Sequence, residues 1–290
     1  MSDAAAQDWS DWLGREQGSH DRLDPGLAAR WAGTFDRPAP DDGAMPQGIH
    51  LCLCTPNAST AALGEDGHPQ RSDSADSFLP PVPLPRRMWA ASEMQFHSPI
   101  ALGAQIERVS RIASIEEKSG RSGTLVFVDV DHRTSADGAL AVTERQTLVY
   151  REAAASDARL SPPPATGQPF DPAEWDAHHT LVPDPRLLFR YSALTFNTHR
   201  IHYDAPYARE IERYRGLVVH GPLMASLLLQ LAAREFGDNR LASFGFRAIS
   251  PAIADEPLHL ALRQGEADIE LAAIAADDGR ECLEARASIA

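Results

Sequence analysis

Residues 191–229 read YSALTFNTHRIHYDAPYAREIERYRGLVVHGPLMASLLL, and this stretch decides the fold. Its last part is almost wholly apolar and continues beyond residue 229, which predicts a buried core helix over Gly221–Phe236. Pro222 fits the first turn of such a helix, where no backbone N–H is needed. The earlier part of the stretch carries Asn197 and, five positions later, His202. The stretch therefore predicts a polar pair next to the entrance of a core helix.

Strands are predicted on both sides of this helix. Alternating and β-branched residues predict three strands before it, over residues 105–115, 124–133 and 140–150. Turn residues separate them at 120–123 and at Asp137-Gly138, the latter a hairpin signal. Four further strands are predicted after the helix, over residues 241–249, 258–263, 268–275 and 281–287. A short strand is also predicted over residues 187–193, ahead of the polar pair.

The N-terminal region predicts helices and then irregular structure. Residues 8–36 are expected to be helical in two pieces, the second capped by Asp24 ahead of Pro25. Residues 50–54 predict a short strand with two buried cysteines on one face. Residues 64–85 are rich in Pro, Gly, Asp and Ser and predict an irregular excursion over the surface.

The chain contains two copies of one unit. Pro99 and Pro251 each precede a turn and an alternating strand, and an Asp-Gly hairpin follows in both copies. A Pro-, Ala- and Ser-rich linker at residues 156–170 separates the copies. The sequence thus predicts an α+β protein with two sheets, each wrapped around a central helix. The domains are residues 1–155, which include an N-terminal helical extension, and residues 171–290.

Charge and composition exclude several classes of protein. The net charge of −14 argues against a general nucleic-acid binder, which needs a basic field. The most apolar run, residues 217–233, is interrupted by polar residues and is too short to span a membrane. The acidic N-terminus lacks the layout of a signal peptide, so a cytoplasmic location is expected. The three cysteines have no partner cluster at zinc spacing, so no metal site is expected.

The residues of the opening stretch suit proton transfer next to a developing negative charge. Histidine titrates closest to neutrality, so His202 suits a proton shuttle, and the carboxamide of Asn197 can hold a water molecule beside it. The free amides at the start of the helix, above all that of Gly221, suit an acyl oxygen that becomes negative. A buried helix with glycine kept for close packing is an equally good interpretation on physical grounds alone.

Together these residues resemble the MaoC-like (R)-specific enoyl-CoA hydratase and 3-hydroxyacyl-thioester dehydratase family. The family motif is an Asp-x4-His pair followed by a His-Gly that opens the central helix. Asn197 falls on the Asp position, His202 on the His position and His220-Gly221 on the helix entrance. Ser226 matches a helix serine that lies near the catalytic pair in some members. The resemblance implies a double hotdog fold in which the first copy lacks the catalytic pair and helps to form the substrate tunnel.

A wider set of segments resembles one branch of that family. The string RYSALTFNTHRIHYD at residues 190–204 is similar to itaconyl-CoA and mesaconyl-C4-CoA (3-methylfumaryl-CoA) hydratases and to mitochondrial-type acyl-thioester dehydratases. The segments RRMWAASEMQF, KSGRSGTLVFV and TERQTLVYRE in the first half extend the likeness to most of residues 23–290. The resemblance implies hydration of itaconyl-CoA or mesaconyl-C4-CoA to citramalyl-CoA, without a metal or redox cofactor.

The resemblance also assigns roles to individual residues. Gly221 would polarise the thioester carbonyl and His202 would activate water, while Asn197, which cannot exchange a proton as a carboxyl does, would orient the water and the ring. The candidates for binding the substrate's free carboxylate or the CoA moiety are Arg87, Arg190 and Arg200.

Other functions remain open. A medium- or long-chain 3-hydroxyacyl-thioester dehydratase is the second interpretation. A hotdog protein that binds thioesters without turnover, or a thioesterase, is the third. The chain would act alone or as a homodimer.

Overall fold

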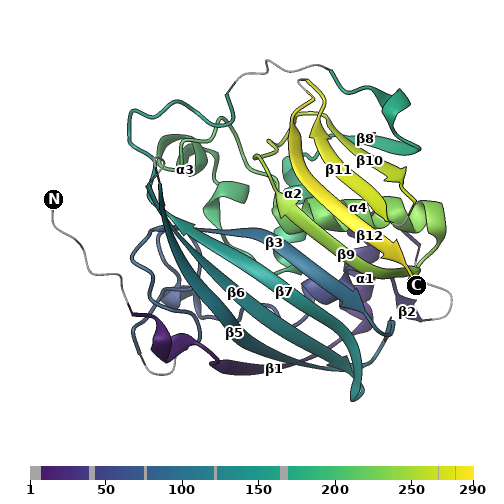
Figure 1. Cartoon of the computed structure of the whole chain (residues 1–290), viewed down its shortest axis with the longest axis horizontal. Coiled ribbons are helices and arrows are strands. Elements are labelled where there is room, and N and C mark those ends of the chain that lie inside the picture. The colour runs from purple at the N-terminus through teal and green to yellow at the C-terminus, as the bar shows by residue number, and fades with distance from the viewer. Residues whose placement is uncertain are drawn as a thin grey trace.

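The computed structural model describes residues 8–38, 43–74, 77–120, 123–163, 169–266, 268–277 and 279–290. Within these residues, ten strands form one antiparallel sheet in the order β1-β5-β6-β7-β3-β9-β12-β11-β10-β8. Figure 1 shows this sheet curving across the molecule, with α1, α2 and α4 behind it. The protein is therefore of the α+β class, with a large antiparallel sheet and few helices.

The first half of the chain supplies seven of the described strands. They are β1 (Glu16–Arg22), β2 (Ala44–Met45), β3 (Arg86–Phe96), β4 (Ile100–Ala101), β5 (Gln105–Gly120), β6 (Gly123–Ala136) and β7 (Ala139–Arg151). The three predicted strands are confirmed as β5, β6 and β7, although each is longer than predicted. Asp137 and Gly138 both have positive φ, as a tight hairpin between right-twisted strands requires.

The second half supplies five described strands and three helices. The strands are β8 (Ala177–Leu181), β9 (Leu241–Ala248), β10 (Leu258–Gln264), β11 (Ile269–Ala275) and β12 (Glu281–Ile289). The helices are α2 (Pro185–Leu194), α3 (Ala205–Glu210) and α4 (Gly221–Phe236). The predictions of α4 and of strands at β9 to β12 are confirmed.

The two halves share one continuous sheet, whereas the sequence predicts two sheets. Strand β3 of the first half pairs with β9 of the second, from Ala91 opposite Arg247 to Gln95 opposite Ser243. An edge strand leaves a row of backbone N–H and C=O groups unpaired. Pairing β3 with β9 satisfies both edges at once, so the halves join edge to edge.

The core helix α4 is buried on almost every side. Leu223, Leu228, Leu229 and Leu231 are each no more than 3% exposed. Burial of a leucine side chain contributes roughly 1.5–3 kcal/mol, so this helix holds the second half of the sheet in place. The described residues of the first half have no helix of this kind between α1 and β3. That segment forms the short 3-10 turns η2 (Ile49–Cys52) and η3 (Thr60–Ala62) instead.

Two local predictions in the first half are wrong. Residues 50–54 were expected to be a strand, but η2 covers most of them and Cys54 has a positive φ. The two cysteines therefore do not share a strand face, although Cys52 is buried. The first predicted helical piece is a short 3-10 turn, η1 (Ser10–Trp12), followed by β1. The N-terminal extension is thus only partly helical.

Helices α1 (Pro25–Thr34) and α2 begin in the same way. The side chains of Asp24 and Asp184 each accept a hydrogen bond from a backbone N–H in the first turn, and a proline follows each of them. The prediction of α1 is confirmed, and the strand predicted over residues 187–193 is wrong. Helix α2 begins at the same Asp-Pro signal, which outweighs the short apolar run that favoured a strand. In the described part of the chain, no helix is long and apolar enough to cross a membrane.

Candidate active site

A sharp turn carries the chain from α2 into the candidate site. Phe196 adopts a positive φ, and the Oδ1 atom of Asn197 accepts a 2.9 Å hydrogen bond from the backbone N–H of His199. A 3-10 turn, η5 (Arg200–His202), then directs His202 inward. Asn197 thus stabilises the turn that places the histidine.

His202 is held in one tautomer. Its Nδ1 atom lies 2.7 Å from the carbonyl oxygen of Val218, which can only accept, so Nδ1 carries the proton. The other nitrogen, Nε2, therefore has a free lone pair, and no described residue donates a hydrogen bond to it. His202 is only 7% exposed. Burial lowers its pKa to about 4, so the ring is neutral at physiological pH.

His220 lies face to face with His202. The ring centroids are 3.5 Å apart and the planes differ by 18°. Burial, and then the neighbouring His202, lower the pKa of His220 well below its usual value. Its Nε2 atom is 2.9 Å from the hydroxyl of Ser192, whereas Nδ1 is buried without a hydrogen-bond partner among the described residues. The stack fixes the plane of His202 from one side.

The start of α4 lies directly after His220. Gly221 is the first residue of the helix, and its N–H has no acceptor among the described residues. Gly221 is partly exposed, and a Cβ atom there would lie 3.7 Å from the carbonyl oxygen of Trp89. Ser226 is buried and donates its hydroxyl hydrogen to the carbonyl of Pro222 at 2.8 Å. Gly221 thus offers a free donor, while Ser226 is satisfied within its own helix.

A loop from the first half closes over the turn that carries His202. We call residues 64–68 the Asp66 loop. The backbone N–H of Arg200 donates to the carbonyl of Asp66 at 2.9 Å, and the hydroxyl of Thr198 donates to the carbonyl of Gly67 at 2.6 Å. The prediction of an irregular surface excursion is therefore wrong for this part of the segment, which docks on the candidate site.

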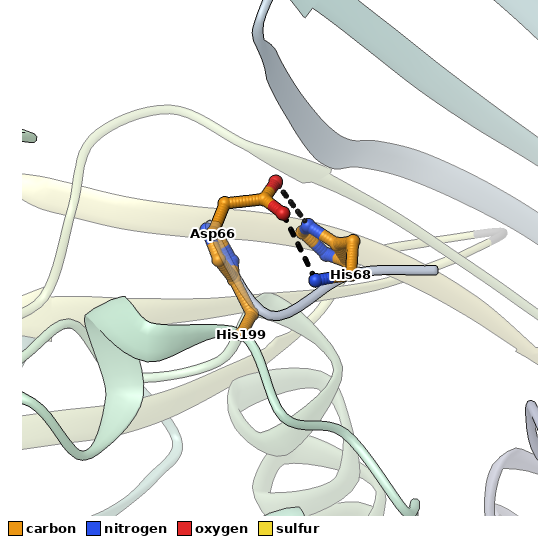
Figure 2. A group of neighbouring side chains, drawn as sticks. All are labelled: Asp66, His68 and His199. Carbon is orange, nitrogen blue, oxygen red and sulfur yellow. Dashed lines mark hydrogen bonds and ion pairs between the residues drawn. The ribbon is translucent and has the colours of Figure 1, made fainter. Parts of the chain in front are cut away.

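The Asp66 loop brings a carboxylate and an imidazole to the site. Figure 2 shows Asp66, His68 and His199 together, with the carboxylate of Asp66 2.9 Å from Nδ1 of His68. The ring centroids of His68 and His199 are 4.1 Å apart, and those of His199 and His202 are 5.4 Å apart. The rings of His68, His199 and His202 thus form a continuous row that begins at Asp66.

The spacing of this group also fits a metal ion. One ligand atom from each of Asp66, His68 and His199 lies within 4.8 Å of the others. Burial is the largest cause that lowers the pKa of His68, and the positive charge of Arg87 is the next. Burial is the largest cause that lowers the pKa of His199, and Arg87 adds a smaller contribution. Burial raises the pKa of Asp66, but the hydrogen bonds and charge of His68, with a small contribution from Arg87, lower it. The positive charge of Arg87 therefore works against a bound metal dication at this place.

The three predicted arginines lie in different places. Arg87, on β3, is the one whose charge reaches the histidine row. Arg190 is exposed and donates to the carbonyl of Gly33 on α1, at a groove of about 940 Å³ that none of the site histidines lines. Arg200 pairs with Asp204 at 2.8 Å, and its guanidinium lies over a tyrosine ring. Arg190 and Arg200 are therefore engaged elsewhere.

Neither Asp66 nor His68 was predicted from the sequence as a site residue. His199, which lies next to them, is only 8% exposed. Asp66 and His68 precede the turn by more than a hundred positions, in a segment whose composition predicts only a loop. The Asp-Gly-His sequence predicts a tight turn, but it does not indicate that this turn contacts Thr198 and Arg200.

The buried histidines predict acid-sensitive stability. The folded-state pKa of both His50 and His202 is about 4, below the unfolded value near 6.5, so the unfolded chain binds more protons as the pH falls. We expect the free energy of unfolding to fall by about 1.4 kcal/mol per pH unit for each such histidine between about pH 6.5 and pH 4. Urea unfolding at several pH values measures this slope.

His50 provides the control for this measurement, because it is buried outside the histidine row. A His50→Leu variant is expected to show a shallower slope by about one proton. A free energy of unfolding that does not change between pH 7 and pH 5 would contradict the assignment of neutral buried rings.

Comparisons with known proteins identify the family of this chain. Residues 48–254 match the family model described as hydroxyacyl-thioester dehydratase type 2. The mesaconyl-C(4)-CoA hydratase of Chloroflexus aurantiacus is 42% identical over 285 residues, which cover 97% of this chain and 98% of that protein. The structure of a MaoC-like dehydratase from Phytophthora capsici superposes with a TM-score of 0.68 at 14% identity, covering 96% of both chains.

A second solved structure bears on the fold. A Mycobacterium tuberculosis protein described as having a double hotdog fold superposes with a TM-score of 0.57 at 16% identity, covering 96% of both chains. The fold and the site thus define a hydro-lyase of the hotdog class that acts on thioesters. Since the family model matches more than half of the chain, the protein belongs to the hydroxyacyl-thioester dehydratase type 2 family.

Proposed function

We propose that the protein hydrates mesaconyl-C4-CoA to citramalyl-CoA. One structural observation supports this reaction above the others: a neutral His202 with a free Nε2 is stacked on His220, the residue that directly precedes the unpaired N–H of Gly221 at the positive end of α4. Such a pair suits addition of water to a carbon–carbon double bond that is conjugated with a thioester carbonyl. The 42% identity to a mesaconyl-C(4)-CoA hydratase supports the choice of substrate.

In the proposed reaction, the start of α4 first binds the thioester carbonyl. The N–H of Gly221 donates to the thioester oxygen, which gains negative charge as the enolate forms. Loss of one such donor typically costs about 10²–10³-fold in turnover. His202 accepts a proton from water through Nε2, and the water oxygen bonds to the β-carbon. Asn197 fixes the turn, and Ser226 contributes to the wall of the site.

Arg87 is proposed to bind the free carboxylate of the substrate. Mesaconyl-C4-CoA carries one carboxylate besides its thioester, and burial of that charge needs a cation. The positive charge of Arg87 acts on His68 and on Tyr150, whereas Arg190 is bound to the carbonyl of Gly33 and Arg200 is paired with Asp204. This charge favours a dicarboxylic acyl group over a plain fatty chain.

We also propose that the sheet is a pair of fused hotdog units. The division is residues 1–155, a linker at residues 156–170 and residues 171–290, with α4 as the core helix of the second unit. The pairing of β3 with β9 would then be the seam between the units. This arrangement allows the chain to act alone or as a homodimer.

The substrate proposal predicts a clear preference in a hydration assay. We expect mesaconyl-C4-CoA to be converted to citramalyl-CoA with a higher kcat/KM than crotonyl-CoA or a long-chain enoyl-CoA. Mass spectrometry of the CoA products, with itaconyl-CoA included in the panel, measures this preference. An Arg87→Gln variant is expected to lose about tenfold or more in kcat/KM for the dicarboxylic substrate, with little change for crotonyl-CoA.

The same assay tests the second candidate function. The family description favours a dehydratase of hydroxyacyl thioesters, and we take medium- or long-chain 3-hydroxyacyl thioesters as its substrates. Turnover restricted to crotonyl-CoA or longer chains would support that function and reject the dicarboxylic substrate. Release of free CoA would indicate a thioesterase instead.

A further inference from the structure

The proposed hydration needs two groups that exchange protons, and the turn that carries His202 supplies one. A base takes a proton from water, and an acid delivers a proton to the α-carbon. His202 fits the base, because its Nε2 lone pair is free. Asn197 has a carboxamide, which neither takes up nor releases a proton near neutral pH. The Asp position of the family motif therefore supplies no acid in this chain.

The Asp66 loop carries a preorganised pair of the required kind. The carboxylate of Asp66 accepts a hydrogen bond from Nδ1 of His68 at 2.9 Å, and its other oxygen accepts one from the backbone N–H of His68 at 3.0 Å. These two contacts fix the ring and leave Nε2 of His68 for proton transfer. His68 also keeps 19% of its side chain exposed, so its ring is accessible from solvent.

Backbone contacts fix the position of this pair relative to the site. The loop is tied to the turn through the contacts of Thr198 and Arg200 already described. Gly67 lies so close to the turn that an added Cβ atom would be 1.8 Å from the carbonyl oxygen of Thr198. A contact this tight indicates a built interface between the loop and the turn.

From this geometry we propose that His68, held by Asp66, is the second acid–base group of the site, supplied by the first half of the chain. The inference rests on the proposed hydration. An O–H bond of water breaks, the oxygen bonds to the β-carbon, and Nε2 of His202 takes the proton. The electron pair of the double bond moves to the α-carbon, which takes the proton from Nε2 of a protonated His68. Exchange with solvent then resets both rings.

His68 is better suited to carry positive charge than the other rings of the site. Burial lowers the pKa of His202 to about 4, and it lowers the pKa of both His199 and His220 strongly. The pKa of His68 is lowered by burial, by Arg87 and by Arg71, but the hydrogen bond and the charge of Asp66 raise it. Arg87, Arg71, Asp66 and the stacked ring of His199 are the groups that act on His68. Of the four histidines of the site, His68 is the one whose protonation costs least, because the carboxylate of Asp66 is its hydrogen-bond partner.

The test uses the full chain and the enoyl thioester that the wild-type protein hydrates, with mesaconyl-C4-CoA as the first probe. A His68→Asn variant keeps a donor toward Asp66 and removes Nε2. It is expected to lose about 10²–10³-fold in kcat, with KM little changed, and to lose the decline of kcat at high pH. An Asp66→Asn variant is expected to lose roughly 10–100-fold. In this variant the decline of kcat at high pH should shift to lower pH, because the carboxylate of Asp66 no longer stabilises the protonated ring of His68.

Thr198→Val is the matched control, because it removes one contact between loop and turn without touching the pair. It should keep the wild-type pH profile. A wild-type kcat and pH profile in His68→Asn would overturn the inference while the hydration itself stands. The inference is also overturned if Thr198→Val reproduces the shifted profile of Asp66→Asn. An equimolar bound metal, with loss of activity on chelation, would overturn it too. If the wild-type protein hydrates no enoyl thioester, the proposed function falls, and this inference falls with it.

Discussion

Replacement of His202 with alanine is expected to lower kcat by about 10²–10⁴-fold, the usual contribution of a positioned acid–base group. His202 has a free Nε2, its tautomer is fixed by Val218, and its ring is stacked on His220, which precedes α4. Steady-state hydration of the preferred enoyl thioester measures the loss. The result would separate a catalytic histidine from one that only fills the core.

The alanine variant also leaves the carbonyl of Val218 without its donor. An unsatisfied buried polar group costs about 1–3 kcal/mol, so the stability of the variant must be measured beside its activity. His202→Asn is the sharper variant, because the side-chain amide can still donate to Val218 while no group replaces Nε2. Near-normal turnover in a folded His202→Asn protein would refute the proposed mechanism.

A Gly67→Ala substitution is expected to have the second largest effect, a loss of folding stability. Gly67 has a φ of +89°, and its added Cβ would lie 1.8 Å from the carbonyl oxygen of Thr198. The strained backbone costs about 1–3 kcal/mol, and the overlap adds about as much again unless the Asp66 loop moves away. We expect a clear fall in the free energy of unfolding, or a loop displaced from the turn with loss of activity.

Gly103 provides a matched control for this substitution. It has the same φ of +89°, but nothing lies within 4 Å of an added Cβ. Gly103→Ala should therefore show the backbone cost alone, with full hydration activity. Chemical unfolding and kcat of the two variants give the comparison. Equal effects of both substitutions would show that the contact between the loop and the turn contributes nothing.

The sequence was sufficient for elements whose signals are local. Helix α4 is recognisable because an apolar run follows Gly221 and Pro222, and the hairpin at Asp137-Gly138 because both residues tolerate positive φ. Asp24 predicts the start of α1 through its side-chain cap, and the same signal at Asp184 marks α2. The strand predicted over residues 187–193 failed because a short apolar run does not distinguish a strand from a buried helix.

The sequence also determined one side of the candidate site. His202 and His220 are close in the chain, and only the short helix α3 and the segment before α4 separate them. The stack of His202 on His220 follows from the same short connection, because Val218 holds the His202 ring next to the residue that precedes α4.

Only the tertiary structure decided the other side. The placement of Asp66 and His68 depends on contacts with Thr198 and Arg200, more than a hundred positions away. The seam of β3 with β9 is equally non-local. Local propensity carries no information about such pairings, because they follow from the burial and hydrogen bonding of the whole chain. The sequence by itself determined one histidine, His202, near the start of α4. The tertiary structure added the carboxylate of Asp66 and the imidazole of His68, two groups that can exchange protons where the carboxamide of Asn197 cannot.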